Sequence, residues 1–471
     1  MNSNNKLKSN VIFSAVFQLL FFIAPIITTP YVARVFRPED LGIYATTYAL
    51  AILFVQVANF GIPIYGVRTI AQSQDEKERT SNFISIWTMQ ALVTILVFII
   101  YALFCLLFIT SFKFYIIQGL LILASIFDIS WFFTGIEEIK RTIFRNVLSK
   151  ILTILLILTF VNTADDLARY ILINVFGVLI GNLSMCLQMF KFLDFSSFKI
   201  SISKGTVFSS FGLLLPQLID SLKSNASRMV LANLTSYSAV GFYDQGNKIT
   251  TMINGVFGAV TNSILPRIAS HVKENKFEEI EKITKKFLTF NKLFVLVIIS
   301  GIINVSGYFV PVFFGEGYSN IVPVLNISGV SILFSSLSYY FGRTVLISNS
   351  LDKEYRKVTL FSCIALIIFS FLLDGSLYEK GAAISFTLAT FVQFVLTLMY
   401  SKDFINIRFI KRNVFENILF IIINVFIIKI VQMFFKFEGN LINFFFYGFL
   451  SILVSVVLYI ISEKTKKLIY N

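Results

Sequence analysis

Long apolar runs separated by short polar stretches recur along the whole chain. A helix that crosses a bilayer needs about 20 predominantly apolar residues, which is close to the length of each run. A sliding window of about 19 residues therefore identifies candidate spans. It finds fourteen, at residues 10–33, 41–62, 83–109, 114–134, 143–161, 168–190, 206–233, 239–264, 287–313, 321–347, 357–374, 381–400, 416–435 and 441–462. The pattern predicts an all-α polytopic membrane protein.

The connections between these spans differ sharply in basic residues. Together with the two termini and the adjoining ends of the spans, the even-numbered connections carry 28 Lys and Arg, whereas the odd-numbered connections carry 6. Connections that remain in the cytoplasm carry the excess of positive charge, so we expect both termini in the cytoplasm. The longest connection, at 266–286, is rich in Lys and Glu, and we interpret it as a solvated linker or surface helix.

Composition supports this interpretation and excludes several classes of function. Hydrophobic residues make up 56% of the 471 positions and charged residues 14%, against about 25% charged residues in soluble domains. The formal net charge of +14 does not indicate a nucleic-acid partner, because the cations lie between apolar runs. Cys105, Cys186 and Cys363 are isolated within apolar runs, so we expect neither a disulfide nor a metal site.

The sequence also lacks the short motifs of common soluble enzymes. It contains no phosphate-binding loop for ATP, no serine-hydrolase elbow and no paired-histidine zinc motif. We therefore expect no catalytic residues and no cofactor. Work on a substrate would be driven by an H⁺ or Na⁺ gradient, or by the substrate's own concentration difference.

A short motif occurs twice. Leu41-Gly42-Ile43-Tyr44 opens the second span, and Val240-Gly241-Phe242-Tyr243 opens the eighth, 199 residues later. The same offset relates Arg68 to Arg267. Six spans separate the copies, so they predict parallel repeats with a cavity at their interface. We divide the chain into an N-lobe (1–190, spans 1–6), a cytoplasmic linker (191–204), a C-lobe (205–401, spans 7–12), and spans 13–14 with a cytoplasmic tail (402–471).

Spans seven and eight each carry a polar face. At 100° per residue, the polar residues of span seven are Gln217, Asp220, Ser221, Ser224, Ser227 and Arg228, with Lys223 on the flank. Those of span eight are Asp244, Asn247, Lys248, Thr251, Asn254, Gly255, Gly258 and Asn262. Two adjacent amphipathic spans predict an aqueous cavity between them.

The presence of five ionisable residues on these faces requires an explanation, because placing a charge at mid-bilayer costs about 2.5–3.5 kcal/mol of insertion free energy. Asp220 and Lys223 are three residues apart, and Asp244 and Lys248 are four residues apart. Each pair is either a structural ion pair or part of a functional site. No acidic residue stands three or four positions from Arg228, which favours an anionic ligand or a water-filled cavity around it.

The first repeat offers neutral polar residues, namely Gln18 and Thr28 in span one and Tyr44, Tyr48 and Asn59 in span two. A site that joins both halves would be polar and aromatic on one side and cationic on the other. That combination suits a ligand with sugar hydroxyls and a phosphate. Asp220, Asp244 and Asp128 are candidates for cation coupling, although Asp128 could equally make a helix contact.

Several segments together resemble bacterial oligosaccharide flippases of the Wzx type. They are 25–35 (PIITTPYVARV), 41–44 (LGIY), 59–63 (NFGIP), 65–68 (YGVR), 128–137 (DISWFFTGIE), 240–243 (VGFY) and 265–268 (LPRI). The likeness covers most of the chain and is strongest before residue 270. Arg37 departs from it, because the family usually has Gly there.

This resemblance implies the multidrug/oligosaccharidyl-lipid/polysaccharide exporter fold, with two six-helix lobes and two extra C-terminal helices. It implies a bacterial plasma (inner) membrane protein that flips an undecaprenyl-pyrophosphate-linked oligosaccharide to the outer leaflet. The product would serve O antigen (lipopolysaccharide), capsule or exopolysaccharide synthesis. Membrane lipids, a polysaccharide polymerase and a chain-length regulator are the implied partners.

Two other functions compete with this one. A multidrug/cation antiporter of the same superfamily would favour an acidic cavity, whereas the ionisable residues of spans seven and eight sum to +1. A polysaccharide polymerase would normally carry a large outward loop, and the outward connections here are short.

Overall fold

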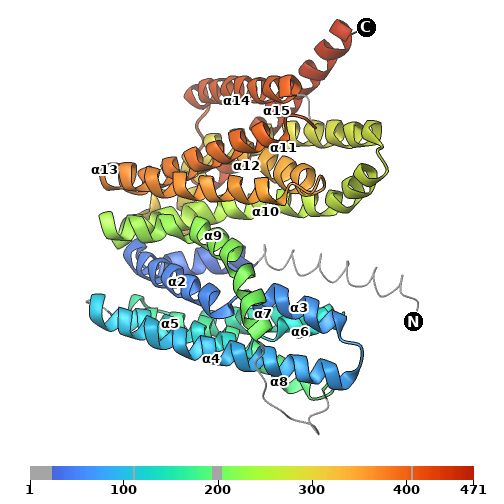
Figure 1. The fold of residues 1–471 in the computed structure, drawn as a ribbon. Helices are drawn as coiled ribbons and strands as arrows, with labels where there is room; N and C mark the ends of the chain where they lie inside the picture. The colour runs from blue at the N-terminus through green and yellow to red at the C-terminus, as the bar shows by residue number, and fades with distance from the viewer. Residues whose placement is uncertain (1–23, 110–111, 194–203, 405–406, 471) are drawn as a thin grey trace. The chain divides into compact units, whose positions relative to one another are not determined.

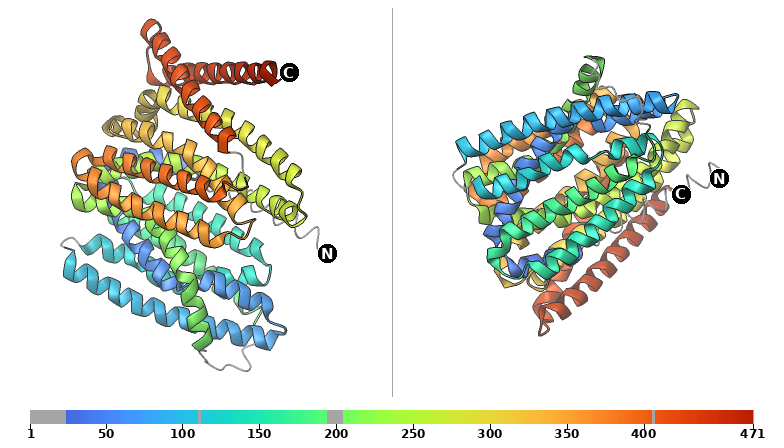
Figure 2. Two further views of the ribbon diagram at one scale, coloured as in Figure 1. Left: turned by 45° about the horizontal axis from the view of Figure 1, so that its top comes forward. Right: turned by 90° about the horizontal axis from the view of Figure 1, so that it is seen from below.

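The chain is helical throughout the part that the structure describes. The computed structural model describes residues 24–109, 112–193, 204–404 and 407–470, and no strand occurs among them. By its internal packing the chain separates into two compact units, Met1–Met229 (unit 1) and Val230–Asn471 (unit 2). Within each unit, long helices pack side by side (Figures 1 and 2). The linker predicted at 191–204 lies mostly outside the described residues, so the lobe boundaries stay a prediction.

Unit 1 begins with a helix at 24–35, the described end of predicted span one. Its other elements are α2 (Pro38–Asn59), α3 (Ile62–Gln72), α4 (Glu76–Phe108), α5 (Phe112–Ala124), η1 (Ser125–Phe127), α6 (Ser130–Gly135), α7 (Ile139–Phe160), η2 (Ala164–Asp166), α8 (Leu167–Met189) and α9 (Lys204–Leu234) up to Met229. Fully buried aromatic rings, including Tyr101, Phe132 and Phe133, fill its core.

Unit 2 consists of α10 (Tyr237–Lys273), α11 (Phe277–Phe314), η4 (Glu316–Tyr318), α12 (Ile321–Tyr339), η5 (Tyr340–Leu346), α13 (Asp352–Ser401), α14 (Ile407–Phe434) and α15 (Asn440–Tyr470). The long α13 is two helices joined at Tyr378, whose φ of 53° and ψ of −134° are not helical. The joint falls between the predicted spans 357–374 and 381–400, so those two spans are confirmed as separate helices.

Among the described residues, ten stretches are long and apolar enough to cross a membrane. One of these is α13, which contributes two helices. The helices α9 and α10 are not among the ten, because their polar faces lower their hydropathy. The all-α membrane fold with about fourteen spans is confirmed.

The helix of the second span is shifted by three residues towards the N-terminus, because it runs from Pro38 to Asn59 rather than from 41 to 62. Phe60 and Gly61 both have positive φ, and α3 then starts in a new direction. A Cβ atom on Gly61 would lie 2.1 Å from the backbone oxygen of Ser210 in α9. Gly61 is therefore needed twice, for the turn and for the close approach of α9.

The Lys/Glu-rich connection at 266–286 is almost entirely helical. Helix α10 continues to Lys273 and α11 begins at Phe277, so a turn of three residues joins them. The turn carries a surface ion pair between Lys276 and Glu274, 2.6 Å apart. Of the two alternatives, the surface helix agrees with the structure, because the connection extends two spans as helices with only a short turn between them.

Helices α14 and α15 pack against α11 and against each other. Buried polar side chains join them. Lys292 of α11 donates to Glu416 of α14 and to Ser462 of α15, the latter at 2.6 Å. Further along, Asn304 donates to Asn424 at 2.9 Å and to Ser451 at 3.1 Å. Polar side chains stabilise contacts between membrane helices because lipid offers them no alternative partner.

Candidate functional site

The cationic face expected on span seven lies on α9. Asp220 is exposed, while Lys223 and Arg228 are half-buried. The Nη1 atom of Arg228 donates to the backbone oxygen of Ser224 at 2.7 Å and to Asn225 Oδ1 at 3.2 Å. These bonds hold the guanidinium along its own helix, with part of it at the protein surface.

The ion pair expected on span eight is formed on α10. Lys248 Nζ lies 2.9 Å from Asp244 Oδ2, and the side chains are 34% and 5% exposed respectively. Gln245 Oε1 also accepts from Lys248, at 3.4 Å. The acid is thus buried beneath the lysine, and the ammonium group is the member of the pair that reaches the surface.

The rest of the polar face of α10 is only partly open. Asn254 is buried, and its Oδ1 accepts a hydrogen bond from Ser335 of α12 at 2.5 Å. Thr251, three residues before it, and Gly255, the next residue, are exposed. Part of the face that was expected to be wet therefore serves the contact between α10 and α12.

The neutral residues expected to complete the site lie in unit 1. Tyr44 and Tyr48 stack, with ring centroids 6.0 Å apart and planes inclined by 19°, and Tyr170 of α8 packs against Tyr44 at 4.8 Å. Thr28 donates to the backbone oxygen of Ala24, and Asn59 is half-buried at the end of α2. Gln18 lies outside the described residues. Unit 1 thus provides a group of three tyrosine rings.

Asp128 lies in a break of the fourth span, between η1 and α6. Its Oδ1 is 3.6 Å from Nη1 of Arg145, whose side chain is only 8% exposed. Arg145 also donates to Asn182 Oδ1 at 3.0 Å and to Asn146 Oδ1. This arrangement favours the helix contact over the ion-binding role for Asp128.

Side-chain donors from other helices satisfy the backbone oxygens of this break. They are Asn182 to Ala124 (2.8 Å), Gln90 to Ser125 (2.6 Å) and to Asp128 (3.2 Å), Trp87 to Ile126 (3.0 Å), and Cys186 to Phe127 (3.4 Å). Inside a membrane, irregular backbone is tolerated only when such partners replace the lost helical bonds. The break is therefore a stable part of unit 1.

The sequence did not single out Asp374, a carboxylate buried in α13. Its Oδ1 accepts from Ser385 Oγ at 3.2 Å, across the joint of α13, and Ser370 is a second polar neighbour. Within the described residues it forms no ion pair with Lys or Arg. In the sequence Asp374 is visible only as an acidic residue at the end of a span, and charged residues are common at that position.

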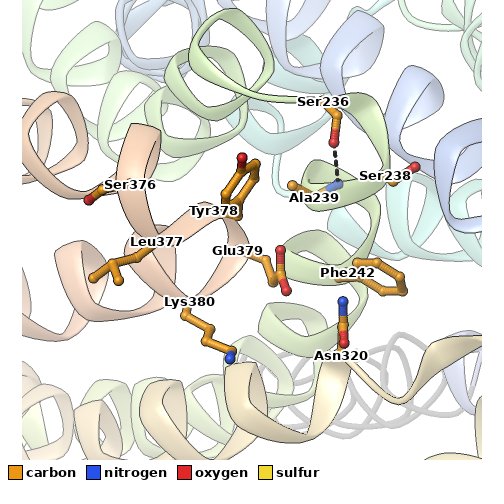
Figure 3. Close-up of a pocket in the computed structure, with 10 residues that line it drawn as sticks. All are labelled: Ser236, Ser238, Ala239, Phe242, Asn320, Ser376, Leu377, Tyr378, Glu379 and Lys380. Carbon is orange, nitrogen blue, oxygen red and sulfur yellow. Dashed lines mark hydrogen bonds between the residues drawn. The ribbon is translucent and has the colours of Figure 1, made fainter.

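A cavity of about 430 Å³ lies beside the joint of α13 (Figure 3). Its lining comes from the start of α10, the start of α12 and the joint itself. The lining residues are Ser236, Ser238, Ala239, Phe242, Asn320, Ser376, Leu377, Tyr378, Glu379 and Lys380. It was not expected from the sequence, because the three segments are far apart along the chain.

The structure therefore brings together some of the predicted residues. Asp244 meets Lys248 in unit 2, and Tyr44 meets Tyr48 in unit 1. Asp128 instead belongs to a separate polar cluster with Arg145. Arg228 shares α9 with Asp220 and Lys223, on the part of that helix that belongs to unit 1.

A family described as polysaccharide biosynthesis protein matches residues 7–272, more than half of the chain. The chain belongs to this family. A candidate O-antigen transporter of Escherichia coli (strain K12) is 24% identical over 413 residues, covering 86% of this chain and 99% of that protein. The capsular polysaccharide biosynthesis protein CapF of Staphylococcus aureus is 26% identical over 194 residues, covering 40% of this chain and 48% of CapF.

Two solved structures of other proteins have the same fold as this chain. The lipid II flippase MurJ, in an inward closed conformation, superposes with a TM-score of 0.75 at 13% identity, over 98% of this chain and 99% of MurJ. An inward-facing multidrug transporter of the MATE family gives 0.63 at 13% identity, over 83% and 97% of the two chains. The predicted fold is confirmed, because the chain shares the fold of these two proteins, and its helices make it a multi-pass membrane protein.

Proposed function

We propose that this protein is a flippase for an undecaprenyl-pyrophosphate-linked oligosaccharide. It moves the lipid-linked unit from the cytoplasmic to the outer leaflet of the bacterial plasma membrane for O antigen, capsule or exopolysaccharide synthesis. Membership of the polysaccharide biosynthesis family carries the proposal. Relatives named for O-antigen transport, capsule synthesis and glycan flipping support it.

The cations of α9 and α10 would hold the pyrophosphate. Arg228 is the principal contact, because it reaches the surface and its planar guanidinium can make paired bonds to phosphate oxygens. Lys223 and Lys248 assist it. Asp220 and Asp244 orient these cations, and the 2.9 Å contact of Asp244 with Lys248 supports this role. The neutral residues Gln18, Thr28, Tyr44, Tyr48 and Asn59 would contact the sugars.

Transport would proceed by alternating access without a chemical step on the substrate, so the protein is a transporter and not an enzyme. Both termini would lie in the cytoplasm, as the basic connections indicate. A gradient of H⁺ or Na⁺ would drive the cycle through an acidic residue such as Asp220 or Asp244. A polymerase and a chain-length regulator would receive the product at the outer leaflet.

Variants of Arg228 test the pyrophosphate contact. In a strain that lacks the native gene, Arg228→Ala should reduce surface polysaccharide at least about tenfold, because a charge-assisted contact is lost. Arg228→Lys should rescue partly, since an ammonium group lacks the planar fork. Immunoblotting should find all variants at normal abundance. Lys429→Ala is the matched control, because Lys429 is an exposed cation on α14. Normal polysaccharide from an Arg228→Ala, Lys248→Ala double variant would contradict the site.

The fold that this chain shares with a MATE transporter makes a multidrug exporter the second candidate. An exporter of cationic drugs gains from acidic residues, whereas the ion pair of α10 presents its lysine outward. The two functions predict opposite phenotypes for a deletion strain. Loss of surface polysaccharide with unchanged drug susceptibility supports the flippase, and drug sensitivity with normal polysaccharide supports the exporter.

A further inference from the structure

The cavity of unit 2 lies where three connections meet. They join α9 to α10, η4 to α12, and the two halves of α13. In the predicted topology all three connections are odd-numbered and face outward. Their convergence on one cavity agrees with a common side of the membrane for all three. The cavity therefore belongs to the end of the protein at which a flipped substrate would leave.

Glu379 is the distinctive residue of this cavity. It is only 7% exposed, yet its carboxylate forms no hydrogen bond or ion pair with any residue that the structure describes. Figure 3 shows the carboxylate pointing from the joint of α13 towards α10, beside Phe242 and Asn320. Its oxygens are not among the fully buried polar atoms of the described residues, so they reach the space of the cavity and can accept hydrogen bonds from water or from a bound ligand. The cavity therefore offers a carboxylate acceptor to a ligand that carries hydrogen-bond donors.

The other lining groups indicate which chemical groups a ligand of this cavity would carry. Asn320 supplies an amide that both donates and accepts, and the exposed Lys380 supplies an ammonium group. The ring of Phe242 packs edge-on against the ring of Tyr318, with ring centroids 6.2 Å apart. Tyr378 presents a second ring from a backbone with φ of 53°, a conformation rarely adopted by a bulky residue. Such strain is often retained at functional sites.

We propose that this cavity binds a sugar ring of the oligosaccharide, an inference that rests on the proposed flippase function. Glu379 accepts hydrogen bonds from ring hydroxyls, Asn320 and Lys380 contact the remaining oxygens, and Phe242 and Tyr378 offer apolar ring faces. The volume of 430 Å³ falls among ligand pockets of about 300–1,000 Å³. Charged groups of both signs exclude an acyl chain, and the space exceeds what a bare cation needs.

Binding of free oligosaccharide to the purified full-length protein in nanodiscs tests the assignment. The probe is the repeat-unit oligosaccharide released by mild acid from the lipid-linked pool of the native host, so it carries neither lipid nor pyrophosphate. Glu379→Gln should weaken binding about tenfold, because an amide accepts more weakly than a carboxylate. Glu438→Gln, the same change at an exposed position of the loop before α15, should leave binding unchanged.

Asn320→Ala is a second variant at an exposed position, so it keeps the test valid if Glu379→Gln folds poorly. It too should weaken binding. Wild-type affinity in both variants would overturn the sugar site. Displacement of the oligosaccharide by millimolar spermidine would overturn it in favour of a cation pocket.

Complementation separates failure of this inference from failure of the proposed function. If deletion of the gene abolishes surface polysaccharide but both cavity variants restore it fully, only the sugar site is wrong. If deletion leaves polysaccharide intact, the flippase function itself is wrong. Reduced polysaccharide with either variant at normal abundance supports both.

Discussion

Each unit of the protein contains an interruption of helical structure, within the fourth span in unit 1 and between two spans in unit 2, and the two interruptions are built in opposite ways. In unit 1 the fourth span breaks at η1, and four side chains from α4 and α8 donate to the exposed backbone oxygens. In unit 2 the chain reverses at Tyr378, and a cavity lies beside the reversal. The first interruption is filled by the protein itself, and the second is left open.

The charges at the two interruptions differ in the same way. Asp128 is paired with the buried Arg145. Asp374 and Glu379 are also buried, but neither forms an ion pair with a basic residue among those described. Polar groups without partners are costly in a membrane. An interruption whose polar groups are paired within the protein therefore serves the fold, whereas one with an acidic residue that lacks a basic partner can bind a ligand or an ion. Substitutions at matched positions can test this distinction.

The largest effect is expected at the ion pair of unit 1. Asp128→Asn should lower the free energy of unfolding by about 3 kcal/mol, because it leaves the guanidinium of Arg145 buried without its carboxylate. Unfolding in mixed detergent micelles, followed by tryptophan fluorescence, measures the change. Combining Asp128→Asn with Arg145→Met should recover most of the loss, since the orphaned charge is then removed. A stable single variant would show that the pair is not structural.

A smaller loss of stability is expected when Gln90 is replaced. Its amide nitrogen donates to two backbone oxygens, and its amide oxygen accepts a hydrogen bond from the indole of Trp131. Gln90→Leu should cost about 2 kcal/mol, the desolvation cost of groups left unsatisfied. Gln118 provides the control, since it is also buried but its amide makes no hydrogen bond within the described residues. Gln118→Leu should be neutral or stabilising in the same assay.

The smallest change in stability is expected at the open interruption. Asp374→Asn should alter the free energy of unfolding by about 1 kcal/mol or less, because no basic residue loses its partner. It should nevertheless change the dependence of polysaccharide export on the H⁺ or Na⁺ gradient, measured with ionophores in the complemented strain. A loss as large as that of Asp128→Asn would erase the difference between the two interruptions.

Local patterns account for what the sequence could predict. Each span carries its own run of apolar residues, and the contacts of Asp244 with Lys248 and of Tyr44 with Tyr48 follow from a spacing of four residues on one helix. The gap between the last two spans of the C-lobe is visible as a polar stretch that ends in Glu379 and Lys380.

Non-local contacts account for what the sequence could not predict. The break at η1 contains neither Pro nor Gly, and its donors lie 35 to 59 residues away along the chain. Arg145 sits beside a basic connection, where nothing marks it as buried. The cavity is likewise assembled from three separate connections.

The buried contact of Lys292 with Glu416 has a consequence for the timing of biosynthesis. The two residues are 124 positions apart, so at about 5–20 residues per second the ribosome adds Glu416 about 6–25 s after Lys292. Ser462 arrives later still. During that interval α11 carries an ammonium group that lacks both of these partners and is costly to release into lipid. The insertion machinery must therefore retain α11, or keep water around it, until α14 has been made.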